Sequence, residues 1–358
     1  MERYINSYAT ENDIQIALEN GELLKPYVAY IEDVNRIDWN SKEIVDYTTE
    51  YLTFNILSAG TINWTASRTS ITKTIDYKKN NGEWVSITSN TSSSAPTINV
   101  VEGDKLQFKG NNTAYSSSGS GIFNKLYNSF GGSALFEIEG NIMSLIYGDD
   151  FKNNSTISSD YTFGSLFYNC TGLTSAENLV LPATTLADYC YEKMFYGCTK
   201  LTTAPALPAN TLADYCYDSM FKGCTSLTTA SELPATTLAN RCYYYMFDSC
   251  TSLATAPELP ATTLAQDCYK GMFRQCTSLT TASELPAMTL VEGCYSFMFA
   301  NCEKLNYIKC LATDISTNNY TQGWVQNVAS TGTFVKKPNA TWTTGDNGIP
   351  TGWTVQDA

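Results

Sequence analysis

Apolar and polar positions follow a fixed 26-residue step over residues 159–310. Leu-Pro pairs recur at this step, and so do Met-Phe pairs, from Met194–Phe195 to Met298–Phe299. A period of about 20–29 residues with leucine landmarks is typical of leucine-rich solenoids, in which no repeat buries its core alone. We therefore predict a solenoid over this stretch. The Leu-Pro pairs begin at Leu181, Leu207, Leu233, Leu259 and Leu285.

Within each repeat, a helical pattern is followed by a short extended run. Leu186, Cys190 and Met194 are spaced i, i+4 and i+8, which predicts one face of a short helix. Leu201–Ala204 then predicts a short parallel strand, which ends before the Leu207-Pro208 pair because proline cannot donate to a ladder. Stacked repeats of this kind would lie about 4.8 Å apart, with identical side chains in columns.

Before the repeats, residues 45–158 alternate apolar and polar positions in many short runs. Such runs, separated by turns, predict a β-sandwich. Asn81-Gly82 indicates a type I′ hairpin between two of these runs. The predicted strands are Tyr51–Ile56, Thr61–Ala66, Thr72–Tyr77, Trp84–Thr88, Thr97–Val101, Lys105–Lys109 and Phe136–Glu139.

The two ends of the chain differ from both of these regions. The N-terminal segment predicts a short helix and two strands, Pro26–Ile31 and Arg36–Trp39, and is too small to fold alone. We interpret it as an anchor that docks on a neighbour. The C-terminal segment contains tryptophans, which the repeats lack, and is interpreted as a cap with a closing helix over residues 320–328.

The whole chain is thus predicted to be mixed β and α/β, with an anchor (1–44), a β-sandwich (45–158), a leucine-rich repeat solenoid (159–310) and a C-terminal cap (311–358).

Composition and charge exclude several classes of function. The formal net charge is −13, and no basic patch is present that could neutralise several phosphates, so we expect no nucleic-acid binding and no adhesion to an anionic membrane. Histidine is absent, which removes Ser-His-Asp and Cys-His catalysis and most zinc and iron enzyme sites. Met1–Ser7 lacks the apolar core of an export signal, so we expect a chain that is made in a cytoplasm.

The 12 cysteines fall mainly into two columns that follow the repeat. No pair has the C-x₂₋₄-C spacing of zinc sites, and we interpret the thiols as small, reduced, buried apolar groups. We predict no metal and no cofactor. One column contains Cys190, Cys216, Cys242, Cys268 and Cys294, and the other contains Cys170, Cys198, Cys224, Cys250, Cys276 and Cys302.

Next to these constant columns lie positions that vary from repeat to repeat. A rigid frame with varied outer side chains is how extended repeat surfaces form binding sites. Polar and aromatic groups of this kind suit a sugar ligand, and an ordinary solvated face is the alternative. The predicted ligand-binding residues are Tyr189, Tyr215, Arg241, Tyr244, Tyr245 and Asp267.

Two stretches resemble known families. The repeat motif Met-Phe-x-x-Cys-Thr-x-Leu, followed by Leu-Pro, resembles the BspA-like leucine-rich repeats, which implies surface adhesion. Ala9–Ile14, Pro26–Ile31 and Ile37–Asn40 look like the start of virion-associated proteins of crAss-like phages of gut Bacteroides. That second resemblance implies a protein that is assembled inside its host and needs no export signal.

These resemblances imply a non-enzymatic phage virion structural protein, a head fibre, capsid-decorating or tail fibre subunit, that presents its repeats for host-surface adhesion. A bacterial cell-surface BspA-like adhesin is the alternative, and a polysaccharide-cleaving spike enzyme is a second. The expected partners are capsid or tail proteins at residues 1–44 and a host-surface glycan or protein at the solenoid. We expect the virion as the location and a homo-oligomer, specifically a trimer, as the assembly.

Overall fold

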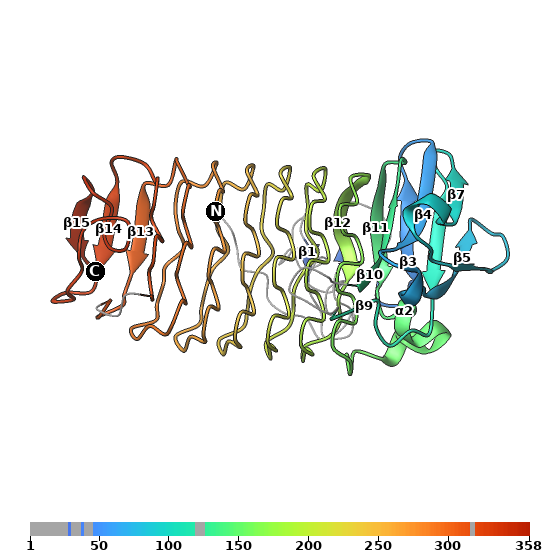
Figure 1. Ribbon diagram of the computed structural model, residues 1–358, viewed down its shortest axis with the longest axis horizontal. Coiled ribbons are helices and arrows are strands. Elements are labelled where there is room, and N and C mark those ends of the chain that lie inside the picture. The colour runs from blue at the N-terminus through green and yellow to red at the C-terminus, as the bar shows by residue number, and fades with distance from the viewer. Residues whose placement is uncertain (1–27, 30–36, 39–45, 119–125, 316–318) are drawn as a thin grey trace, which may run out of the picture.

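The computed structural model describes residues 28–29, 37–38, 46–118, 126–315 and 319–358. This part of the chain forms an elongated body, with packed sheets at one end, a long stack of repeats and a short parallel sheet at the other end (Figure 1). It is mostly β, its sheets are open, and its helices are short: α2 (Ser144–Tyr147), η1 (Thr69–Ile71), η2 (Ser92–Ser94) and η3 (Gly148–Asn153). Among these residues, no helix has the length and apolar character that crossing a bilayer requires.

Two sheets at the first end enclose an aromatic core. Phe54 and Phe108 come from one sheet, and Phe130 of the other sheet lies 4.9 Å from each of them, ring centroid to ring centroid. Trp64 packs on Phe130 at 4.6 Å, and all four rings are buried. Alternation of buried and exposed positions along the strands turns these rings inward. One sheet has the order β12-β11-β3-β8-β5-β6 and the other β7-β4-β10-β9.

The strands of these sheets follow the predicted runs closely, with additions. β9, β10 and β12 were not predicted. The predicted hairpin connects β5 and β6, but it is not a two-residue type I′ turn, because the positive φ of 53° lies at Asn80, one residue before Asn81-Gly82. The strands are β3 (Leu52–Ile56), β4 (Gly60–Ala66), β5 (Thr74–Lys79), β6 (Val85–Thr88), β7 (Thr97–Val100), β8 (Lys105–Lys109), β9 (Ser116–Ser117), β10 (Leu126–Gly132), β11 (Phe136–Asn141) and β12 (Leu173–Val180).

The sheets continue directly into the repeats. β12 belongs to the first repeat and pairs in parallel with β11, from Phe136↔Leu173 to Asn141↔Val180. The next repeats extend this stack through single parallel bridges such as Ser175↔Thr203 and Thr203↔Thr229. One connected set of buried apolar side chains therefore spans the sheets and the repeats.

The helix predicted in each repeat is wrong: the equivalent residues form a chain of tight turns. Glu192 and Met194 donate their amide hydrogens to the carbonyls three residues earlier, at 3.1 Å each. The alternate residues Tyr191 and Lys193 donate instead to Cys216 and Asp218 of the next repeat, at 3.0 and 2.8 Å. An α-helix keeps these bonds within one segment, so a segment that shares them with its neighbour cannot be helical.

The interior of the stack consists of columns of identical rings. Phe195, Phe221 and Phe247 are stacked at centroid distances of 5.4 and 5.6 Å and within 5° of parallel. Tyr191 and Tyr217 begin a second buried column with a 5.7 Å spacing. Close packing of this kind tolerates little change in volume, which explains why the same residue recurs in each repeat.

All 12 cysteines are buried, as predicted, and none is in a disulfide. In one column the thiol contacts a carbonyl oxygen of an earlier repeat, with Cys224 Sγ 3.1 Å from the oxygen of Phe195 and Cys250 Sγ 3.1 Å from that of Phe221. Burial raises the pKa of Cys216 to about 12 and makes the thiolate, the reactive form, scarce.

We therefore expect a maleimide reagent at pH 7.5 to label few of the 12 cysteines in the folded protein and nearly all of them in denaturant without a reducing agent. The physical reason is the combination of burial and raised thiol pKa. Intact-mass spectrometry counts the added groups. Extensive labelling of the folded protein would contradict burial, and poor labelling after denaturation would show that the thiols are already paired.

The stack ends in a parallel sheet of β13 (Tyr307–Cys310), β14 (Thr333–Lys336) and β15 (Thr354–Asp357). The closing helix predicted over residues 320–328 is wrong. This segment is one more repeat unit, or rung, that consists of tight turns. The backbone amides of Phe297 and Phe299 donate to the carbonyls of Gln322 and Trp324 at 2.8 Å each. The buried Trp324 ring packs 6.2 Å from Tyr295 and so covers the end of the tyrosine column.

In the N-terminal segment the structure describes β1 (Val28–Ala29) and β2 (Ile37–Asp38), an antiparallel pair with the register Val28↔Asp38. Both lie inside the strands predicted there. The predicted N-terminal helix lies outside the described residues.

Candidate functional site

The turn segments create one continuous outer surface, which we call the turn face. Along residues 188–197 the side chains alternate in pairs: Cys190–Tyr191 and Met194–Phe195 are buried, whereas Tyr189, Lys193 and Tyr196 are only half-buried. The φ angles of Tyr189, Lys193 and Gly197 are 56°, 53° and 72°, so a left-handed residue recurs every fourth position. The turn face comprises the positions equivalent to 188–189, 192–193 and 196–197 in every repeat.

One line, or file, of predicted ligand-binding residues runs along this face from one repeat to the next. Tyr161, Tyr189 and Tyr215 are stacked with centroids 4.5 Å apart at each step. The Arg241 guanidinium follows, 5.2 Å above the Tyr215 ring, and its Nε donates to Asp267 Oδ2 at 3.0 Å. The structure thus brings four predicted residues into a single ladder of direct contacts.

The stacking changes what these tyrosines can offer to a ligand. Because each ring covers the next at 4.5 Å, the Tyr189 ring has neighbours on both of its faces. Only the edge of the Tyr189 ring is therefore left to contact a ligand. Asp267 is only 4% exposed, so the prediction that all of these varied positions are open to solvent is wrong for this carboxylate.

The other two predicted residues, Tyr244 and Tyr245, form the centre of the turn face. Their rings meet edge to face at 4.6 Å. Tyr245 lies over Gly271 of the next rung, where a Cβ atom would be 2.3 Å from the ring, so only glycine leaves room for it. Arg241 and Lys270 lie 5.6 and 5.8 Å from the Tyr244 ring centroid.

Four residues outside the predicted binding set join this centre, and all of them except Lys270, which was among the varied positions, were missed in the sequence: Lys222, Asp248, Lys270 and Arg274. Asp248 is completely buried and accepts from Arg274 at both carboxylate oxygens, each at 3.1 Å, and from Lys222 at 2.9 Å. Lys222 and Arg274 also lie 5.0 and 5.2 Å from the Tyr245 ring. The sequence contained a signal for three of them, because Lys222, Asp248 and Arg274 are spaced by 26 residues and so occupy the same position in successive repeats.

Another file borders the ladder and has a structural role. Asp188 Oδ1 accepts from the Asp214 amide at 3.0 Å, Asp214 Oδ1 from the Asn240 amide at 2.9 Å, and Asn240 Oδ1 from the Gln266 amide at 3.2 Å. Each side chain therefore ties its rung to the next. Burial, and then the nearby charges of Asp160 and Asp214, raise the pKa of Asp188 above its usual range.

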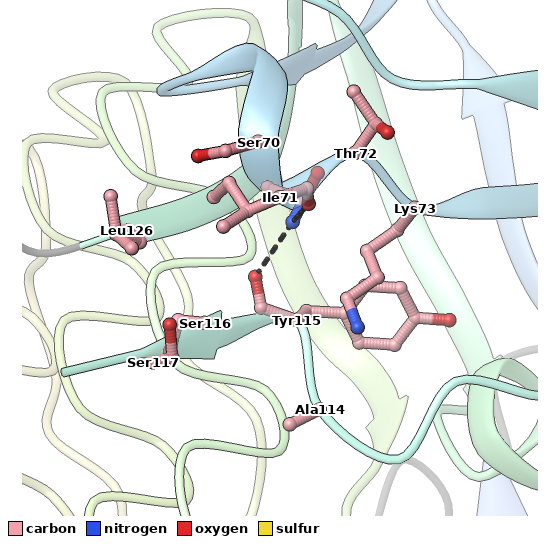
Figure 2. Close-up of a pocket in the computed structure, with 10 residues that line it drawn as sticks. Ser70, Ile71, Thr72, Lys73, Ala114, Tyr115, Ser116, Ser117 and Leu126 are labelled. Atoms are coloured by element: carbon pink, nitrogen blue, oxygen red, sulfur yellow. Dashed lines mark hydrogen bonds between the residues drawn. The ribbon is translucent and has the colours of Figure 1, made fainter. Parts of the chain in front are cut away.

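A pocket of about 330 Å³ lies elsewhere, between the segments Ser70–Lys73 and Ala114–Ser117 at the sheet end (Figure 2). The Asn128 side-chain amide, which lines it, donates to the carbonyls of Ile71 and Tyr115 at 3.0 and 3.1 Å. Its donors are therefore used to join two backbone segments. None of the six predicted binding residues lines this pocket.

The sequence of the repeats matches a known family model. Residues 156–269 and 188–323 match the family model described as BspA type Leucine rich repeat region, in six copies. This confirms the resemblance inferred from the Met-Phe-x-x-Cys-Thr-x-Leu motif, and the match covers the repeats and not the N-terminal segment. No curated protein and no solved structure matches the chain.

Proposed function

We propose that this protein is a non-enzymatic adhesion protein whose turn face binds a ligand on a cell surface. The observation that carries the proposal is the contrast between invariant inner columns and a varied outer face on one rigid frame. Repeat proteins bind through such extended faces. BspA-type repeats agree with a surface role.

The chemistry of the turn face favours binding over catalysis. Asp248 and Asp267 are each held by a lysine and an arginine, at 2.9–3.1 Å. Carboxylates engaged in this way orient cations and aromatic rings, whereas a glycoside-cleaving acid needs a proton that it can donate. We therefore propose adhesion ahead of the alternative of a polysaccharide-cleaving spike enzyme.

For the setting of this adhesion, we propose a phage virion, with the protein as a head fibre, capsid-decorating or tail fibre subunit. Residues 1–44 would attach it to capsid or tail proteins, in a homo-oligomer that we expect to be a trimer. The support is the resemblance of Ala9–Ile14 and Pro26–Ile31 to virion-associated proteins. A bacterial cell-surface BspA-like adhesin fits the repeats equally well, and a protein inventory of purified virions distinguishes the two.

Binding through the turn face predicts that Tyr244→Ser with Tyr245→Asn reduces capture of gut Bacteroides cells at least tenfold. The full chain, biotinylated and displayed in many copies on beads, is the binding reagent, because multivalency raises weak affinities by about 10²–10⁴. Asparagine suits position 245, where φ is 50°.

Tyr307→Ser is the matched control, since Tyr307 is half-buried on β13, away from the turn face. We expect it to bind cells like the parent, and both variants to keep the parental circular dichroism spectrum. Undiminished capture by the Tyr244/Tyr245 variant would show that the turn face is not the adhesive surface.

Attachment through the N-terminal segment predicts that a chain lacking residues 1–44 stays folded but fails to join virions. The described buried core begins at Tyr47, so the deletion removes none of it. The measurement is incorporation of tagged protein into particles during infection, with the full-length tagged chain as control. Normal incorporation of the truncated chain would contradict the proposed anchor.

A further inference from the structure

Cations gather at one place on the turn face. Arg241 and Lys270 converge on Asp267, and Lys222 and Arg274 converge on Asp248. All four surround the Tyr244–Tyr245 pair, with side-chain nitrogens or guanidinium carbons 5.0–5.8 Å from one ring or the other. We call Lys222, Arg241, Lys270 and Arg274 the cation patch. The expectation that the chain has no basic patch is therefore wrong at this place, although the formal net charge is −13, because the four residues come from three different repeats.

Charges of opposite sign occupy different depths in this patch. The side chains of Asp248 and Asp267 are 0% and 6% exposed, whereas those of the four cations are 27–36% exposed. Asp218, a further carboxylate near Tyr244, is also buried. An approaching ligand therefore meets positive charge first, with the compensating negative charge beneath it.

The neighbouring line of turn-face residues, which runs from Asp188 to Glu292, loses its negative charge beside most of the patch. It carries Asp188 before the patch, Asp214 on the repeat of Lys222, and Glu292 after the patch. Beside the patch it carries the neutral amides of Asn240 and Gln266. Carboxylates of this file that would repel an anion are thus missing beside Arg241, Lys270 and Arg274, whereas the repeat of Lys222 carries Asp214.

The aromatic rings of the patch do not offer a free face to a neutral sugar. Arg241 and Lys270 lie against Tyr244, Lys222 and Arg274 lie near Tyr245, and Tyr245 also covers Gly271. Each lysine has three N–H donors and each arginine five, more than the two aspartates use. Hydrogen bonding and charge are therefore the interactions that remain for a ligand.

We infer that the cation patch binds a carboxylate-bearing polysaccharide, with the uronate groups of successive sugars accepting hydrogen bonds from Lys222, Lys270 and the two arginines. This inference rests on the proposed function and specifies its ligand. A polymer suits the arrangement because the cations recur from rung to rung, at the spacing of about 4.8 Å between hydrogen-bonded strands. Binding through half-exposed charges should weaken as salt shortens the Debye length from about 10 Å at 0.1 M.

The test measures binding of the full chain to polygalacturonate by calorimetry, with fully methyl-esterified polygalacturonate as the matched ligand that lacks the charge. We expect binding to polygalacturonate only, with an affinity at least fivefold lower in 300 mM than in 50 mM NaCl. The variant Lys222→Gln/Lys270→Gln should bind at least tenfold more weakly. It should remain folded, because Asp248 keeps Arg274 and Asp267 keeps Arg241.

Lys200→Gln/Lys304→Gln is the control variant, since it removes the same charge from exposed lysines of the repeats. We expect its affinity to stay within twofold of the parent. Equal losses in both variants, equal binding of the esterified polymer, or tighter binding of a single-stranded oligonucleotide would each overturn the inference.

The same proteins in the cell-capture assay separate this inference from the proposed function. Cell capture that persists without polygalacturonate binding refutes the carboxylate ligand and leaves adhesion standing. Polygalacturonate binding without cell capture refutes adhesion and leaves the ligand class standing.

Discussion

Phe247→Ala is expected to lower the free energy of unfolding by about 3–5 kcal/mol, the usual cost of removing a fully buried ring. Phe247 is 0% exposed and stacked between Phe221 and Phe273 at 5.6 and 5.8 Å. The loss affects two inter-repeat interfaces at once, because a stacked repeat touches only its neighbours. Urea denaturation followed by circular dichroism measures it.

The control for this substitution is Phe297→Ala, which removes the same ring from the turn face, where Phe297 is half-buried. We expect a cost of about 0.5–1.5 kcal/mol, the lower part of the usual range for single substitutions. Similar losses at the two positions would contradict the view that the inner phenylalanine column holds the repeats together.

Gly140→Ala is expected to lower the free energy of unfolding by more than about 3 kcal/mol, among the larger effects of a single substitution. Gly140 has φ of 83°, and a Cβ atom there would lie 2.1 Å from the Tyr51 carbonyl oxygen. The atom that blocks the new Cβ belongs to the backbone and cannot rotate away. β11 would therefore have to move away from the segment at Tyr51, next to the start of the repeat stack.

Gly103→Ala isolates the conformational part of this cost. Gly103 has φ of 85°, and no atom lies within 4 Å of the place that a Cβ atom would occupy, so we expect only the left-handed penalty of about 1–2 kcal/mol. Thermal and urea unfolding of both variants give the comparison. Equal losses of unfolding free energy in Gly140→Ala and Gly103→Ala would show that the contact with Tyr51 does not destabilise the protein.

The strands of the sheet region could be predicted because alternation is a local signal. Lys105–Lys109 was predicted with the bounds that β8 has, and Thr97–Val101 within one residue of β7. β12 was missed because its partner is β11, and the paired residues, from Phe136↔Leu173 to Asn141↔Val180, belong to a parallel pair that no turn marks. Pairing between distant segments leaves little trace in either segment alone.

The candidate site could be predicted in part for the same reason. Spacing by 26 residues placed Tyr189, Tyr215, Arg241 and Asp267 in one file. It could not show that Arg241 stacks on Tyr215 and bonds to Asp267, or that Lys222 and Arg274 share the buried Asp248. Those contacts depend on side-chain directions, which a repeat period does not specify.

The sequence by itself determined the repeat, its period and the columns of residues, because identical side chains at a constant step must stack if the repeats stack. Only the tertiary structure decided the backbone between them. Leu186, Cys190 and Met194 suit a helix of 3.6 residues per turn and a chain of turns with a period of four almost equally over so short a segment. The amides of Tyr191 and Lys193 find their acceptors in the next repeat, and that inter-repeat bonding selects the turns.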